Sequence, residues 1–307
     1  MKKLFYSALA LVIATLTLGS ANAVAAEKEY EVNLPNFTSI TADSDFQLTV
    51  TRGNAYSVTL YVEETLYTYV QAGVKGTTLS ISVDNKKIPA EIKKAFRGKG
   101  NEPVYRAVVT MPGNLQAVEL MDKAVLVALD DVFDEASFRL VLSDNSNCNP
   151  FTVNSKSLDV KLDKRANAEF TAESENVKID LSGSSNLSLT QKADVVEVYQ
   201  AGSSNFLFNG SSDKMALTVK GTAKSVLNGT VPTVNYVLSG SSNVNAVNLV
   251  SEDAFVEMNS ICTLVEAASK NLHINISNGA SLTFKNDPVF HITAIKVASV
   301  VDYDEKK

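Results

Sequence analysis

The stretch LSGSSN at residues 181–186 decides the fold, because close copies of it recur along the chain at a fixed spacing. QAGSSN at 200–205 and LSGSSN at 238–243 follow at 19 residues and then at twice 19. Weaker copies fill the gaps in the same register: LDKRAN (162–167), VKGTAK (219–224), EMNSIC (257–262) and ISNGAS (276–281). A further copy, LSDNSN (142–147), begins 20 residues before LDKRAN. A short repeat of this kind indicates stacked units, each burying its apolar face on the next.

Aligning the copies gives columns of similar residues. Two columns are apolar at every copy, and a third is small except at Ile261. Their neighbours are polar or mixed, as the two-residue period of a strand requires. The apolar columns are Val160, Ile179, Val198, Leu217, Tyr236, Phe255, Ile274 and Phe170, Leu189, Phe208, Leu227, Ala246, Val265, Phe284; the small column is Ala166, Ser185, Ser204, Ala223, Ser242, Ile261, Ala280.

Each copy therefore predicts a strand of about five residues, a corner, a second short strand and another turn. The corner residues Gly183, Gly202, Gly221 and Gly240, with Asn259 and Asn278 in later copies, suit a left-handed backbone conformation. The pattern predicts an all-β parallel β-helix. A repeat of antiparallel hairpins is the alternative, but it would need two different turn signals in each copy, and only one strong turn is visible.

An asparagine column follows the corner glycines, at Asn147, Asn167, Asn186, Asn205 and Asn243, with Lys224 and Cys262 interrupting it. We interpret it as a structural ladder of side-chain amides that hydrogen-bond along the axis. The alternative is a row of amides presented to a glycan, which should lie beside exposed aromatic residues.

Charged columns also have a structural interpretation. Asp159, Lys178 and Glu197 alternate in sign from copy to copy, which avoids stacking like charges on a solvated face. Cys148 and Cys262 lie six coils apart, roughly 29 Å along the axis. Because a disulfide needs Cα atoms within about 7 Å, we expect no bridge between them.

Residues 1–23 have the features of a signal peptide, with Lys2 and Lys3 before an apolar run and Ala21-Asn22-Ala23 at the cleavage site. A cut after Ala25 is the alternative. The prediction is export to the periplasm or cell surface, with no membrane span after cleavage. We expect a linker at 24–34, one β-helical domain at 35–300 (irregular coils 35–118, regular coils 119–300) and a tail at 301–307.

The composition limits the chemistry. The chain has 307 residues with a formal charge of −6, two Cys and two His. Loss of two lysines with residues 1–23 changes the charge to −8, which argues against nucleic acid as a partner. His273 and His291 are too few for a multi-histidine metal centre. We therefore expect no cofactor, no metal and no catalytic residues. The basic segment 86–101, around a short helix, is interpreted as a solvated loop rather than an anion-binding patch.

The order of the N-terminal motifs resembles a known family. RGN at 52–54 lies between two strands, GTTLSISV occupies 76–83 and VVTMP occupies 108–112, all before the repeated GSSN corners. This order resembles the head GIN domain family of putative autotransporter adhesins, found among exported proteins of Bacteroidetes, over roughly residues 35–300. The resemblance implies a right-handed parallel β-helix and an adhesin role, and it supplies no catalytic residues.

The resulting functional hypothesis is an exported, non-enzymatic binding or adhesion module that presents a flat stacked-strand surface to a glycan or to an envelope or host protein. A β-helical polysaccharide-degrading enzyme and a structural envelope scaffold are the alternatives. Because the end coils of a solenoid expose strand edges, an end-to-end homo-oligomer is also expected.

Overall fold

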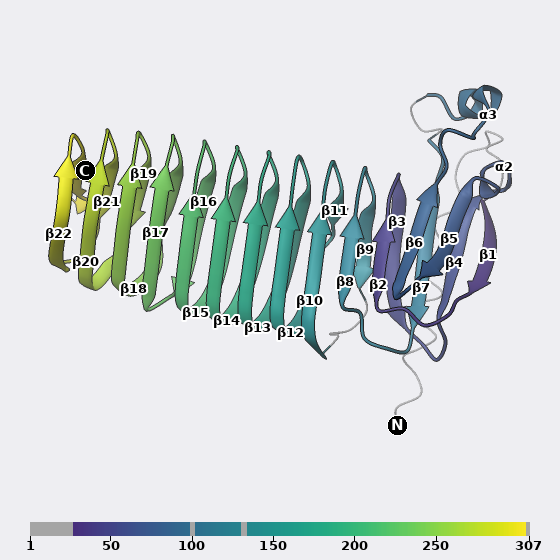
Figure 1. Cartoon of the computed structure of the whole chain (residues 1–307), viewed down its shortest axis with the longest axis horizontal. Coiled ribbons are helices and arrows are strands. Elements are labelled where there is room, and N and C mark those ends of the chain that lie inside the picture. Colours follow the sequence, from purple (N-terminus) through teal and green to yellow (C-terminus); the bar gives the residue numbers. More distant parts are fainter. Residues whose placement is uncertain (1–26, 99–101, 130–133, 305–307) are drawn as a thin grey trace.

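The computed structural model describes residues 27–98, 102–129 and 134–304. It confirms the predicted all-β fold class: the chain forms a β-solenoid of about nine turns, about 19 residues apart, with 67% of residues in strands and 4% in helices. Figure 1 shows the turns side by side along one long axis. Strands of successive repeats pair in parallel, so the antiparallel-hairpin alternative is wrong for this region.

The N-terminal elements, in chain order, are β1 (Glu27–Asn33), β2 (Ser39–Ala42), β3 (Phe46–Arg52), β4 (Ser57–Glu63), α2 (Glu64–Tyr67), β5 (Val70–Lys75), β6 (Thr78–Val83), α3 (Ala90–Ala95) and β7 (Tyr105–Met111). The repeat region contains β8 (Ala117–Leu120), β9 (Val125–Leu129), β10 (Asp134–Leu142), β11 (Asn147–Cys148), β12 (Phe151–Leu162), β13 (Asn167–Leu181), β14 (Asn186–Gln200), β15 (Asn205–Val219), β16 (Lys224–Thr230), β17 (Thr233–Ser239), β18 (Asn243–Asn259), β19 (Thr263–Glu266), β20 (Ala268–Ser277), β21 (Ser281–Phe284), β22 (Val289–Lys296) and β23 (Ser299–Asp302).

The central strands are longer than predicted because each runs through the second bend of its coil. In β13, β14 and β15 a single 15-residue strand joins one tight corner to the next. The bend is marked by two consecutive exposed residues, Glu175 and Asn176 in β13, where the in–out alternation changes phase. Each coil therefore has one glycine corner and one gentle bend.

The predicted columns hold up to β17 and then shift by one residue. Tyr236 pairs with Val256, so Val256 is buried and Phe255, predicted to be in the core, is exposed. The corner of this coil is at Ser260, with φ 78°, rather than at the predicted Asn259. Asn243 pairs with Thr263, and Cys262 is buried while Ile261 is exposed.

The shift has a local cause. The β16–β18 pairing contains a register irregularity between Val226 and Asn228, which adds one residue to the coil. The coil from Gly240 to Ser260 has 20 residues, and the next, to Asn278, has 18. Cys262 thus continues the small column, and Glu266 rather than Val265 is fully buried in the second apolar column. The fixed period was the wrong assumption here.

The first coils are not stacked in chain order. β2 lies between β6 and β8, and β3 lies between β7 and β9, so the coil of residues 39–52 is inserted between two coils that follow it in sequence. Antiparallel strands then close this end, with β5 on β6, β4 on β7 and β1 on β4. Helix α3 lies in the predicted basic segment and projects from this end (Figure 1).

The structure has strands in two segments that the sequence analysis left outside the domain. Residues 27–33, expected to be a linker, form β1, and β23 extends to Asp302, into the expected tail. The predicted signal peptide at 1–23 lies outside the described residues. Among the residues described, neither helix is long and apolar enough to cross a membrane.

Candidate functional site

The asparagine column forms a hydrogen-bonded row at the glycine corner. The Asn167, Asn186 and Asn205 side-chain amides each donate to the side-chain oxygen of the asparagine one coil before, at 2.9, 2.6 and 2.7 Å. Asn147 accepts the first of these bonds. Asn243, beyond the break at Lys224, instead donates to Thr263 Oγ1 at 2.5 Å. The amides thus bond to one another along the axis.

The corner glycines that precede this row all have positive φ. Gly183, Gly202, Gly221 and Gly240 have φ values of 66°, 69°, 73° and 78°. A Cβ on Gly202 would be 2.5 Å from the carbonyl oxygen of Gly183 on the coil before. The absence of a side chain therefore serves the close contact of successive corners as well as the backbone conformation.

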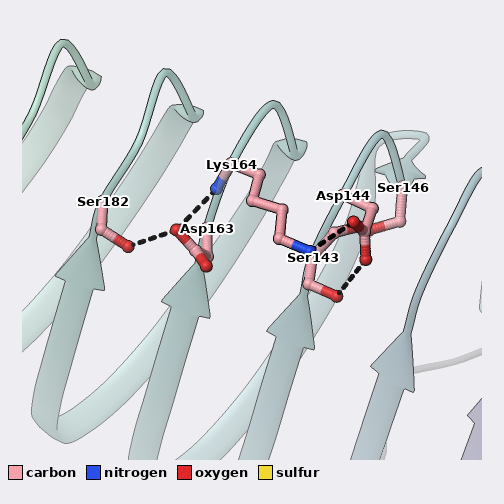
Figure 2. A network of polar contacts seen from close by, with 6 residues as sticks. All are labelled: Ser143, Asp144, Ser146, Asp163, Lys164 and Ser182. Carbon is pink, nitrogen blue, oxygen red and sulfur yellow. Dashed lines mark hydrogen bonds and ion pairs between the residues drawn. The ribbon is translucent and has the colours of Figure 1, made fainter.

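The corners at Asp122, Asp144 and Lys164 carry a charged residue where later ones carry glycine. Figure 2 shows the last two of these corners. Lys164 has φ 58°, and its ammonium group contacts Asp144 at 2.5 Å. That hydrogen bond lowers the pKa of Asp144. Asp163 accepts the Lys164 backbone N–H at 2.7 Å and the Ser182 hydroxyl at 2.8 Å. These carboxylates are occupied by local partners and stabilise the corners.

The column next to the asparagine row holds no aromatic residue: it contains Glu169, Ser188, Leu207, Val226 and Asn245. Leu207 and Val226 are outward-facing in the strands that follow the corner, and both are more than a third exposed. The glycan alternative for this row required neighbouring exposed aromatic residues. The aromatic rings of Phe255, His273 and His291 lie on a different face of the solenoid.

The second face is formed by β17, β18, β20 and β22, where three rings stack along the axis. Phe255 and His273 have ring centroids 4.3 Å apart, and His273 and His291 have centroids 4.4 Å apart, with interplanar angles of 11° and 12°. Both faces of His273 are covered by a neighbouring ring, whereas Phe255 and His291 are each covered on one face only by this stack. Ring edges carry partial positive charge and attract oxygen atoms.

Amides and a carboxylate surround this ring stack. A shallow depression of about 310 Å³ is lined by Asn235, Val237, Glu257 and Asn275 together with Phe255 and His273 of the stack. All four are exposed. His291 Nε2 lies 3.0 Å from Asn271 Oδ1, and the Asn271 amide donates to Asp253 at 2.6 Å, which fixes the orientation of the last ring. We call the surface formed by Asn235, Val237, Phe255, Glu257, His273, Asn275 and His291 the aromatic–amide surface. The one-residue shift brings Phe255 onto it, which explains why the fixed period missed this surface.

A larger groove of about 850 Å³ follows the gentle bend of the earlier coils. Its lining includes Glu175, Asp194 and Asp213, which follow one another one coil apart, and Lys192, which pairs with Glu173 at 2.8 Å. The Asp159–Lys178–Glu197 column does alternate in sign, but this acidic column does not. Its carboxylates are exposed, whereas a general acid usually needs burial to raise its pKa.

The remaining reactive groups are inside the solenoid. Cys148 and Cys262 are free and buried, and burial raises the pKa of both thiols, which disfavours the nucleophilic thiolate. Glu266 accepts the Ser251 hydroxyl at 2.6 Å, and burial raises its pKa to about 7. In the part of the chain that the structure describes, no three His, Cys, Asp or Glu side chains gather as a metal site would require.

Fold and surfaces together define an all-β solenoid with extended side-chain faces. The chain belongs to the family described as "Putative auto-transporter adhesin, head GIN domain", whose model matches residues 36–207 and 177–288. The predicted family is therefore confirmed. A comparison with curated proteins gave no match.

Comparison with solved structures gives similarities at low sequence identity. A putative adhesin from Parabacteroides merdae is 12% identical with a TM-score of 0.53, covering 90% of this chain and 96% of its own. A putative lipid binding protein from Parabacteroides distasonis is 14% identical, with the same coverage and a TM-score of 0.47. The first likeness supports the fold alone.

Proposed function

We propose that this protein is an exported, non-enzymatic adhesion module of the cell envelope that binds a glycan on the aromatic–amide surface. Family membership supports an adhesion-like role. The predicted signal peptide supports export, and the joining of all 23 strands into one sheet supports residues 35–300 acting as one unit.

The observation that carries the glycan proposal is the group of exposed side chains on this surface. Asn235 and Asn275 can donate to and accept from sugar hydroxyls, and Glu257 can accept two hydroxyl bonds. The ring edge of His273 can contact the same oxygen atoms, while Val237 offers a small apolar contact for sugar C–H groups. Envelope or host proteins are the alternative partners.

Glycan-array binding followed by calorimetry on the purified protein tests the proposal. Asn235→Ala together with Asn275→Ala should weaken binding by at least about tenfold, since two direct polar contacts are lost. Asn176→Ala, an exposed amide on the same side five coils earlier than Asn271, is the matched control and should bind normally. Unchanged binding in the double variant, or binding of an envelope protein and no glycan, contradicts the proposal.

A polysaccharide-degrading enzyme is the second candidate, because the groove at the bend holds carboxylates one coil apart. Assays on uronate and neutral polysaccharides distinguish the two functions. The adhesion proposal expects no product, whereas cleavage that is lost in Asp194→Asn would assign catalysis to the groove. A structural scaffold would show no soluble ligand and would co-purify with envelope components.

Export is tested separately from binding. Protease added to intact cells should digest a surface-exposed protein and leave a periplasmic one intact. Retention of the full-length chain in the cytoplasm would contradict export.

A further inference from the structure

The face that carries the aromatic–amide surface continues toward the N-terminus without a break. Two lines of outward side chains run along it, and parallel pairing places Tyr199, Thr218 and Val237 in one of them. The other line passes through Ala216 and Asn235. The register irregularity between β16 and β18 lies in another part of the coil, so the pairings of β15, β17 and β18 on this face contain no shift. Figure 1 shows these strands side by side along the axis.

The charge pattern of the two lines changes at Tyr199. In the two coils before it, the lines carry Asp159, Lys161, Lys178 and Asp180. In the four coils after it, the lines contain one carboxylate, Glu257, and no lysine or arginine. Alternating charges suit a face that stays in water, whereas a ligand that covers a charged group removes part of its hydration at a cost. The loss of charge therefore marks the part of the face that a ligand covers.

Large apolar side chains are exposed in the same part of the face. Tyr199, Val237 and Phe255 are 41%, 40% and 41% exposed. Tyr199 and Val237 are two coils apart, roughly 10 Å, and the coil between them adds only Ala216 and Thr218 to the two lines. An exposed apolar surface of this extent is typical of a binding site.

Tyr199 and Lys220 repeat, at the far end, the chemistry of the aromatic–amide surface. The Lys220 ammonium nitrogen lies 5.3 Å from the centroid of the Tyr199 ring. The ring can contact the C–H groups of a sugar, while the phenol hydroxyl and the ammonium group can bond to its hydroxyls. Asn275, at the other end, is four coils from Tyr199, or roughly 19 Å.

A ligand that contacts both ends must be extended and lie parallel to the solenoid axis. The backbone groups of these strands bond from coil to coil, so this face offers no strand edge to a peptide, and contacts come from side chains. A pyranose unit in a β-1,4-linked chain is about as long as the rise of one coil, so one unit can lie over each coil. Residues 214–220, 233–239, 253–259 and 271–277 together carry two lysines and two carboxylates, which favours an uncharged chain.

We propose that the aromatic–amide surface is one end of a longer site that reaches Tyr199 and binds a linear, uncharged, β-1,4-linked polysaccharide. Asn235 and Asn275 contact the sugar units at one end, and Tyr199 with Lys220 contacts the unit at the other. The site spans five coils, so about five sugar units fill it. The inference rests on the proposed glycan binding and adds to it the length, direction and charge of the ligand.

Calorimetry with cello-, manno-, xylo- and chito-oligosaccharides of two to six units tests the longer site. In the series that binds, affinity should rise at least about tenfold from two to five units and change little at six. Tyr199→Ala should weaken binding of the five-unit ligand by at least about tenfold and leave the two-unit ligand unaffected. Tyr199→Phe keeps the ring and should bind the five-unit ligand nearly as well as the unmodified protein. Leu207→Ala, which removes an exposed apolar side chain from another face, is the matched control and should bind both lengths normally.

The outcomes separate this inference from the proposed function. Glycan binding that is lost in the Asn235→Ala and Asn275→Ala double variant but does not strengthen with length overturns the longer site alone. An unchanged five-unit affinity in Tyr199→Ala, or an equal loss for both lengths, does the same, as does binding restricted to branched or acidic glycans. If no glycan binds, the proposed function fails and the longer site fails with it.

Discussion

At the residue scale, Glu266 is the one carboxylate buried in the core of the C-terminal coils for which a pKa near neutrality is expected. It is fully buried, and desolvation raises its pKa from 4.5 to about 7, although the Ser251 hydroxyl opposes this rise. Tyr236 lies beside it, and the pKa of the tyrosine is also raised by burial. The native state therefore holds the Glu266 proton more tightly than the unfolded chain does.

This difference predicts a pH dependence of stability. Below pH 4.5 the carboxyl is protonated in both states and contributes nothing. Between pH 4.5 and about 7 only the native state is protonated, so the free energy of unfolding falls as the pH rises, by about 3 kcal/mol in total. Glu266→Gln should remove this fall and stabilise the protein at pH 8 in urea titrations. Glu252→Gln, an exposed control, should keep it. An unchanged pH profile in Glu266→Gln contradicts the assignment.

The corner glycines allow a second prediction at this scale. Gly202→Ala should lower the free energy of unfolding more than Gly76→Ala, although their φ values are 69° and 64°. Both variants incur about 1–2 kcal/mol for a left-handed alanine. Only Gly202 adds a clash, with the Gly183 carbonyl, because nothing lies within 4 Å of a Cβ at Gly76. Urea unfolding measures the difference, and equal losses would show that corner stacking is not tight.

At the scale of the element, the asparagine row should stabilise the coils it joins. Asn186 both donates to Asn167 and accepts from Asn205, whereas Asn243 has one side-chain partner. Asn186→Ala should therefore cost about 1 kcal/mol more than Asn243→Ala in the free energy of unfolding. Equal costs in chemical denaturation would indicate that the amides do not act as a row.

The sequence predicted the strands and corners well wherever the period of 19 holds, because each column must repeat its side-chain size to stack. It failed at residues 255–265, where a bulge adds one residue that only backbone pairing reveals. Ile261 in a small column was the warning sign. A second amide row, Asn209, Asn228 and Asn248, was missed although Asn-Gly recurs 19 residues apart at 209–210 and 228–229. The acidic column at 175, 194 and 213 was equally visible and was not recognised.

At the scale of the whole molecule, the order of the first coils could not be predicted, because the coil of residues 39–52 is inserted between later ones. A sequence repeat predicts which coils are neighbours in space only where coils that follow one another in sequence also stack on one another. The aromatic–amide surface was out of reach for a related reason. It depends on which residues the shifted coil turns outward, and Phe255 was assigned to the core.

The stacking of the coils also determines where the solenoid begins to unfold. Because each coil contacts only its neighbours, stability is passed along the stack, and an open end should fray before the middle. Amide hydrogens of β22 and β23 should exchange with solvent faster than those of β13 and β14, which are paired on both sides. Hydrogen exchange read by mass spectrometry measures this difference. Equal exchange in the C-terminal and central coils would mean that the end of the stack does not fray.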